Sequence, residues 1–109
     1  MFCKPVMVRQ APQSRLDERT AGRLAELFRA FSDANRVRLI GALLDGECSV
    51  MALAEAIGLS ESATSHHLRG LRQLQLVRAR KDGRQVYYQL DDEHVAMLFK
   101  QGLSHVLHG

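Results

Sequence analysis

Apolar residues recur every three or four positions in several stretches of the chain, which is the spacing of an amphipathic helix. Glycine and short polar residues separate these stretches. Gly58, for example, follows an apolar stretch at the place where a helix C-terminus needs a left-handed backbone. The pattern predicts helices over Leu16–Phe31, Ala34–Leu44, Ser49–Ile57 and Ser60–Leu76, and a last helix after the acidic residues 91–93.

The predicted helix from Ser60 to Leu76 has two chemically different faces. At 100° per residue, one face gathers Thr64, Leu68, Leu71 and Gln75. The opposite face carries hydroxyls, an imidazole, an amide and a guanidinium: Ser62, Ser65, His66, Gln73 and Arg69. Such groups can address base edges in the major groove of DNA, and an ordinary surface helix would show the same pattern.

The segment from Val77 to Leu90 alternates like two strands around Asp82-Gly83, a dipeptide that favours a two-residue hairpin turn. Helix, turn, helix and hairpin follow each other in the order of a winged helix. We therefore expect a mainly α fold with a two-stranded β-hairpin wing, a winged helix-turn-helix that dimerises through its N- and C-terminal helices.

Cations gather at this hairpin, where a wing would lie along DNA phosphates. Lysine and arginine on a hairpin can also serve only to keep an edge strand soluble. On the first interpretation, double-stranded DNA is the partner, and the residues that face it divide into two groups. Base edges are assigned to Ser62, Ser65, His66 and Arg69, and phosphates to Arg72, Arg80, Lys81 and Arg84. Ser60, which is placed to cap the helix, is counted with the DNA-binding residues.

Three segments resemble the ArsR/SmtB family of metal-responsive bacterial repressors: DANRVRLIGALLDGE, LAEAIGLSESATSHHLRGLRQLQLV and KDGRQVYYQLDDEHV. The resemblance covers about residues 20–108. It implies a homodimeric repressor that leaves its operator when metal binds. Thr64 stands where relatives commonly carry valine, and we expect little effect on the fold because both side chains are β-branched.

The composition agrees with one small soluble domain. The chain has 109 residues and a formal net charge of +3, a modest excess that leans toward a polyanionic partner. No apolar run is long enough for a membrane span, and two cysteines are too few for a disulfide scaffold, so a cytoplasmic protein is expected. Residues 1–14 hold both prolines and predict a flexible arm, with a single domain over 15–109.

The two cysteines offer one candidate for sensing chemistry. Cys48 lies just before a predicted helix, whose N-terminus can activate a thiol. The resembled family often completes a thiophilic metal site two or three residues later, where this chain has Val50 and Met51. Cys3 could reach across from the arm, although two thiolates alone make a poor closed site. A thiol, redox or thiophilic-metal sensor using Cys48 with Cys3 remains an alternative, as does a plain structural cysteine.

Three of the five histidines fall in the last sixteen residues. His105 and His108 are three apart, so they share a helix face. His94 points nearly the same way as His105 but stands about 16 Å away along the axis, too far to share an ion. Two antiparallel copies would remove this obstacle, because Asp92 and His94 of one chain would meet His105 and His108 of the other.

One carboxylate and three imidazoles suit Zn²⁺ and also Co²⁺, and their geometry leaves Cd²⁺ and Ni²⁺ open. The same spacing is the C-terminal-helix zinc pattern of the resembled family, Asp-x-His followed eleven residues after that histidine by His-x-x-His or His-x-x-Glu. The competing interpretation is an amphipathic helix with incidental surface histidines. Four protein ligands leave no open position for a substrate water, so we do not expect an enzyme.

Overall fold

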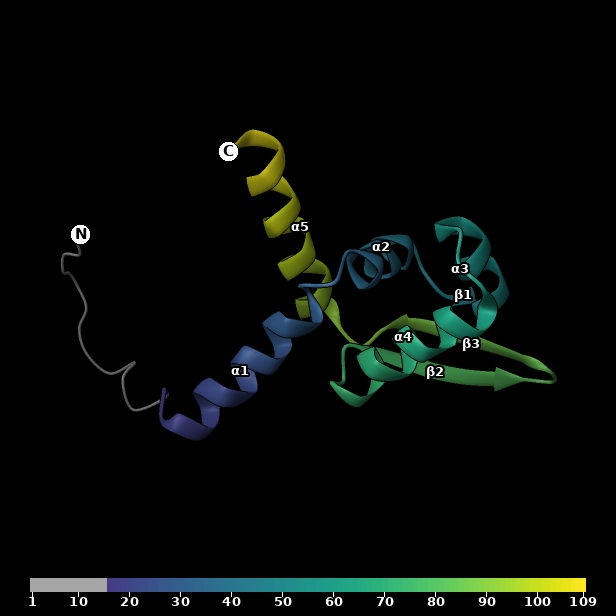
Figure 1. The fold of residues 1–109 in the computed structure, drawn as a ribbon, viewed down its shortest axis with the longest axis horizontal. Helices are drawn as coiled ribbons and strands as arrows, with labels where there is room; N and C mark the ends of the chain where they lie inside the picture. Colours follow the sequence, from purple (N-terminus) through teal and green to yellow (C-terminus); the bar gives the residue numbers. More distant parts are fainter. Residues whose placement is uncertain (1–15) are drawn as a thin grey trace.

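Five helices and a small sheet make up residues 16–109, the part of the chain that the computed structural model describes. The predicted N-terminal arm, and Cys3 within it, lie outside these residues. The elements are α1 (Glu18–Ala30), α2 (Ala34–Ala42), β1 (Cys48–Ser49), α3 (Val50–Ile57), α4 (Glu61–Gln73), β2 (Val77–Asp82), β3 (Gln85–Leu90) and α5 (Glu93–His108) (Figure 1). All five predicted helices are present, with ends within a few residues of the expected positions.

Short polar side chains cap the helices. The hydroxyl of Ser60 accepts a hydrogen bond from the backbone amide of Ala63 at 3.0 Å, which satisfies an otherwise unpaired amide in the first turn of α4. Asp17, Asp33, Ser49 and Asp92 cap the other helices in the same way. Gly58 ends α3 at φ 74°, the left-handed backbone that the sequence predicts.

The sheet has three antiparallel strands in the order β1-β3-β2, so the two-stranded hairpin of the sequence prediction is incomplete. The missing strand is β1, in which Cys48 pairs with Tyr88 and Ser49 with Tyr87. The hairpin turn also lies one residue later than predicted. Asp82 still pairs with Gln85, so the turn residues are 83 and 84, and the glycine takes φ 64°.

A single hydrophobic core lies beneath the helix-turn-helix. α2, α3 and α4 contribute fully buried leucines and an isoleucine, and the sheet closes the core from the other side. Its largest fully buried apolar side chains are Leu39, Ile40, Leu43, Leu53, Leu68, Leu71 and Val77. Gln75 was predicted to face this core, but α4 ends before it, and Gln75 is exposed in a turn at φ 62°. The buried leucines leave the opposite side of α4 open to solvent.

Thr64 occupies the core as the β-branched pattern predicts, but its buried hydroxyl has no hydrogen-bond partner among residues 16–109. Replacing Thr64 with valine is expected to raise the free energy of unfolding by about 1 kcal/mol, because valine removes an unpaired polar group and keeps the shape. Urea denaturation would measure this change. The matched replacement at exposed Thr20 should bring no gain, and a less stable Thr64→Val variant would contradict the argument.

Candidate DNA-binding surface and metal ligands

The outer side of α4 presents the polar groups that the sequence assigns to base edges. Ser62, His66 and Arg69 are exposed, as is Ser60 at the cap, and Ser65 is half-buried. Thr64, Leu68 and Leu71 of the same helix are buried behind them. The helix therefore displays hydroxyl, imidazole and guanidinium groups on a rigid surface, as base recognition requires. Arg72 is exposed near the end of α4, on the way to the hairpin.

Two arginines of α2 connect this helix to the helix-turn-helix formed by α3 and α4. Arg36 Nε lies 3.5 Å from His67 Nδ1 on α4, and its guanidinium rests against Gly70, where a Cβ atom would lie 3.3 Å from Nη2. Arg38 donates to the carbonyl oxygen of Ile57 at 3.1 Å, at the end of α3. These contacts join α2 to both helices of the motif.

The basic residues of the hairpin differ in what surrounds them. Lys81 and Arg84 are exposed at the tip, without an ion pair among residues 16–109. Arg78 lies 3.8 Å from the carboxylate of Asp91. Arg80 is different, because both oxygens of the Glu47 carboxylate accept hydrogen bonds from its guanidinium. The structure thus gives Arg80 an internal partner that the sequence prediction of a phosphate contact did not include.

The first two predicted metal ligands lie together at the start of α5. Asp92 Oδ1 accepts hydrogen bonds from the amides of His94 and Val95 at 2.9 and 3.3 Å, and Oδ2 lies 3.4 Å from His94 Nδ1. Burial raises the pKa of the Asp92 carboxyl, but hydrogen bonds from the His94 ring and from the two amides outweigh this effect and lower it. The side chain of His94 is 91% exposed, so its ring is open to a ligand from outside the chain.

The other two predicted ligands, His105 and His108, lie on successive turns near the end of α5, and both are exposed. His108 Nδ1 lies 3.0 Å from the carbonyl oxygen of Ser104. When Nδ1 carries the proton and donates this bond, Nε2 is left with a free lone pair for a metal.

Within residues 16–109 of one chain, no three histidine, cysteine, aspartate or glutamate side chains gather into a metal-binding group. His94 and His105 are eleven residues apart on one continuous helix, which corresponds to about 16 Å. The structure therefore brings Asp92 to His94 and places His105 near His108, but the two pairs remain at opposite ends of α5. The donor types fit Zn²⁺, and a complete set requires a second chain.

Cys48 is a free, half-buried cysteine in β1, packed against the core. It pairs with Tyr88 across the sheet, and no second thiol lies in the described part of the chain.

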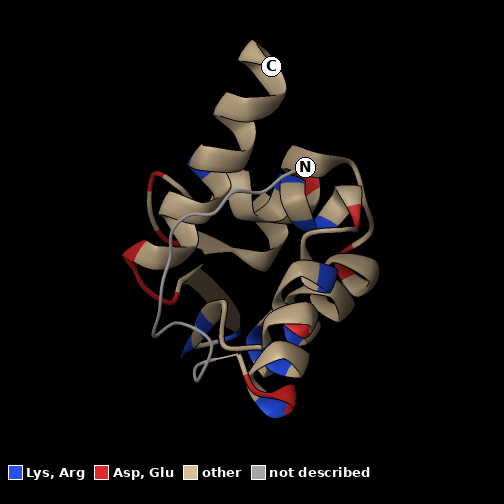
Figure 2. Cartoon of the chain, turned by 90° about the vertical axis from the view of Figure 1, so that its left-hand side faces the viewer, with Lys and Arg blue, Asp and Glu red and all other residues tan. Residues whose placement is uncertain are grey.

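An uncovered apolar surface runs along α5 and the end of α1. Figure 2 shows the C-terminal part of α5 without Lys, Arg, Asp or Glu, and Val106 and Leu107 there are 76% and 68% exposed. A groove of about 360 Å³ lies beside them, lined by Phe31, Val37, Leu98, Phe99, Gly102, Leu103 and Val106. Large apolar side chains gathered in this way are typical of a surface that a partner covers. Figure 1 shows α1 and α5 extending away from the helix-turn-helix.

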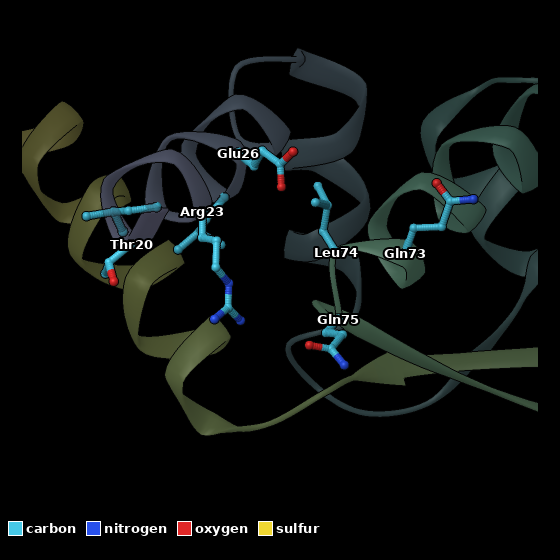
Figure 3. A pocket seen from close by; sticks show the side chains of 8 residues that line it. Thr20, Arg23, Glu26, Gln73, Leu74 and Gln75 are labelled. Atoms are coloured by element: carbon cyan, nitrogen blue, oxygen red, sulfur yellow. The ribbon is translucent and has the colours of Figure 1, made fainter. Parts of the chain in front are cut away.

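A second, more polar pocket of about 410 Å³ lies between α1 and the end of α4. In Figure 3, Thr20, Arg23 and Glu26 of α1 stand on one side and Leu74 and Gln75 on the other. None of the predicted metal ligands or DNA-binding residues lines it, so the candidate site does not extend into this pocket.

Residues 33–79 match the profile of the arsR family of bacterial regulatory proteins. A transcriptional repressor SmtB homolog of Synechocystis is 43% identical over 99 residues, which cover 91% of this chain and 75% of that protein. The regulator NmtR of Mycobacterium tuberculosis is 39% identical over 100 residues, 92% of this chain and 83% of that protein.

A solved structure, the homodimeric winged helix-turn-helix DNA-binding domain Mb0332 from Mycobacterium bovis, superposes with a TM-score of 0.73. It is 30% identical, and the match covers 93% of this chain and 89% of the other. The similarity thus includes the wing and the terminal helices as well as the helix-turn-helix. In the described residues, no helix is both long and apolar enough to cross a membrane.

Proposed function

Because this chain belongs to the arsR family of bacterial regulatory proteins, we propose that it is a metal-sensing transcriptional repressor. Its relatives are transcriptional regulators, and the chain is not an enzyme. In the proposal, the metal-free homodimer binds operator DNA, and Zn²⁺ or Co²⁺ releases it by binding at the dimer interface. A regulator of this kind acts on bacterial DNA, which places it in the cytoplasm.

The observation that carries the proposal is the distribution of donors on α5. Asp92 and His94 lie together at its start, His105 and His108 lie near its end, and an uncovered apolar surface accompanies the helix. Two antiparallel copies of α5 would bring opposite ends together at two equivalent positions. Asp92 and His94 of one protomer, with His105 and His108 of its partner, would then hold each ion. When bound, the ion would supply a crosslink between protomers.

The DNA-binding part of the proposal follows from exposure and charge. Ser62, Ser65, His66 and Arg69 lie on the side of α4 away from the core, and we assign them to the major groove. Ser60, which caps α4, is proposed as a further DNA-binding residue. Arg72, Lys81 and Arg84 are exposed cations beside or on the hairpin, and we assign them to phosphates. A two-fold dimer would present two such surfaces to successive half-sites.

Replacing Arg84 with alanine should weaken binding to all DNA sequences and reduce the salt dependence of the binding constant by about one unit, because one phosphate contact is lost. Ser65→Ala is the matched change on α4, and it should alter sequence preference more than the salt slope. Fluorescence anisotropy at several salt concentrations would measure both. Unchanged slopes for Arg84→Ala and Lys81→Ala together would contradict the assignment of the wing.

Operator binding with and without added metal tests the proposed function. Zn²⁺ should release the metal-free protein from DNA, and a chelator should restore binding. A thiol oxidant should have no effect, because the proposed ligands do not include Cys48 or Cys3. Release by the oxidant and not by zinc would favour the thiol-sensing alternative. Parallel titrations with Co²⁺, Cd²⁺ and Ni²⁺ would rank the ions, which geometry alone does not order.

A further inference from the structure

The guanidinium of Arg80 is enclosed by two carboxylates and an aromatic ring. Nε and Nη2 donate to the two oxygens of Glu47 at 2.9 and 2.8 Å, and Nη1 lies 3.5 Å from Oδ2 of Asp82. One face of the group lies over the ring of Tyr87, 4.8 Å from its centroid. All three nitrogens of this side chain therefore already face a carboxylate, although half of the side chain is exposed.

We propose that Arg80 is a positioning residue of the wing, held in place by Glu47, and that it does not contact DNA. The proposal rests on the DNA-binding function proposed above. Two carboxylates around one guanidinium leave the cluster with a net negative charge, which opposes the approach of a phosphate. The hydrogen bonds from Arg80 hold the pKa of Glu47 below its ordinary value, so this carboxylate is ionised at neutral pH.

The contact joins the wing to the helix-turn-helix. Arg80 on β2 pairs with Tyr87 on β3, and Tyr87 pairs with Ser49 on β1. Glu47 directly precedes β1, and Ser49 caps α3 through the amide of Ala52. The interaction thus crosses the whole sheet and ends where the first helix of the motif begins. An arginine that spans three strands in this way fixes the angle of the hairpin relative to α3.

The neighbouring cations have no comparable partner. Lys81 and Arg84 are exposed and lie outside every ion pair found among the described residues. They are free to meet phosphates, whereas a phosphate could engage Arg80 only by displacing a bidentate carboxylate. Of the three basic residues nearest the hairpin tip, Arg80 therefore positions the wing, and Lys81 and Arg84 are left to bind phosphates.

A double-mutant cycle with Arg80→Gln and Glu47→Gln tests this division through operator affinity at several salt concentrations. Each single change should weaken binding by roughly three- to tenfold, and the double variant should bind no worse than either, because both remove the same contact. The salt slope should stay at the parent value in all three. Arg84→Gln is the matched control, and it should lower the slope by about one.

A loss of about one unit of salt slope in Arg80→Gln, with no such loss in Glu47→Gln, would show that Arg80 contacts a phosphate and would overturn the proposal. Unchanged operator affinity in both single variants would overturn it as well. If Arg84→Gln and Lys81→Gln also leave the slope unchanged, the wing assignment fails and the positioning role fails with it.

Thermal unfolding of each variant would identify any that lose the fold. Arg80→Lys then replaces Arg80→Gln in the cycle, because lysine keeps the charge but not the two parallel hydrogen bonds. The positioning role predicts weaker binding with an unchanged slope for this variant too. Full operator affinity in Arg80→Lys would mean that charge alone is needed, and it would overturn the proposal.

Discussion

A His105→Ala variant should bind its operator as tightly as the parent protein and fail to release it when zinc is added. His105 is exposed near the end of α5, so its loss should leave the core and α4 unchanged. Removing one of four ligands should lower zinc affinity by at least about 100-fold, since even changing the outer partners of a ligand costs 10- to 100-fold. Competition with a chromophoric chelator would measure zinc affinity, and anisotropy would measure operator release.

Ser104→Ala is the matched control, because Ser104 is also exposed and only its backbone oxygen faces His108. The Ser104→Ala variant should keep the zinc affinity of the parent protein and should still release its operator when zinc is added. A His105→Ala protein that still releases its operator at the parent zinc concentration would refute the assignment of His105. Zinc affinity of the parent should also decrease as the solution is acidified, because an imidazole must lose its proton before it binds metal.

A charge on the uncovered apolar surface of α5 should prevent two chains from forming a dimer. A Val106→Glu variant should dissociate into monomers and lose operator affinity by about 100-fold or more, because a monomer reaches only one half-site. Val106 is 76% exposed in the single chain and lines the apolar groove beside α5, so a charge there leaves the chain's own core intact. In a dimer the same charge would be buried twice without a partner.

Analytical ultracentrifugation would measure this dissociation. Met51→Glu provides the control, because Met51 is 50% exposed but belongs to α3, away from the apolar surface of α1 and α5. That variant should stay dimeric. A Val106→Glu protein that remains dimeric at micromolar concentration would place the interface elsewhere.

Local chemistry made the helices predictable. Ser60 before α4 and Gly58 after α3 act within three or four residues of their own position, so the sequence alone identifies them. The donor spacing on α5 is equally local, because a continuous helix converts residue number directly into direction and distance. Asp92, His94, His105 and His108 therefore lie on α5 or at its cap, as the sequence predicts.

Contacts between distant segments were not predictable in the same way. The strand Cys48–Ser49 has only two residues, too few to show an alternating pattern, and it exists because Tyr87 and Tyr88 present an open edge. Glu47 and Arg80 are 33 residues apart, so the local sequence around either residue does not predict their ion pair. The hairpin turn lies one residue later than the Asp82-Gly83 dipeptide predicts, because the pairing of Asp82 with Gln85 extends both strands toward the tip.

The short strand β1 has a consequence for how the operator could be released. Its Ser49 pairs with the hairpin and caps α3, and α3 packs on α4, so we expect the hairpin and the DNA-binding helix α4 of one protomer to move as one unit. Release of the operator is then not expected to come from a rearrangement within that unit. What can still change is the distance, measured along the DNA double helix, between the α4 helices of the two protomers. In the proposed repressor, a bound metal ion would then change the spacing between half-sites that the dimer prefers, and the bases contacted in each half-site would stay the same.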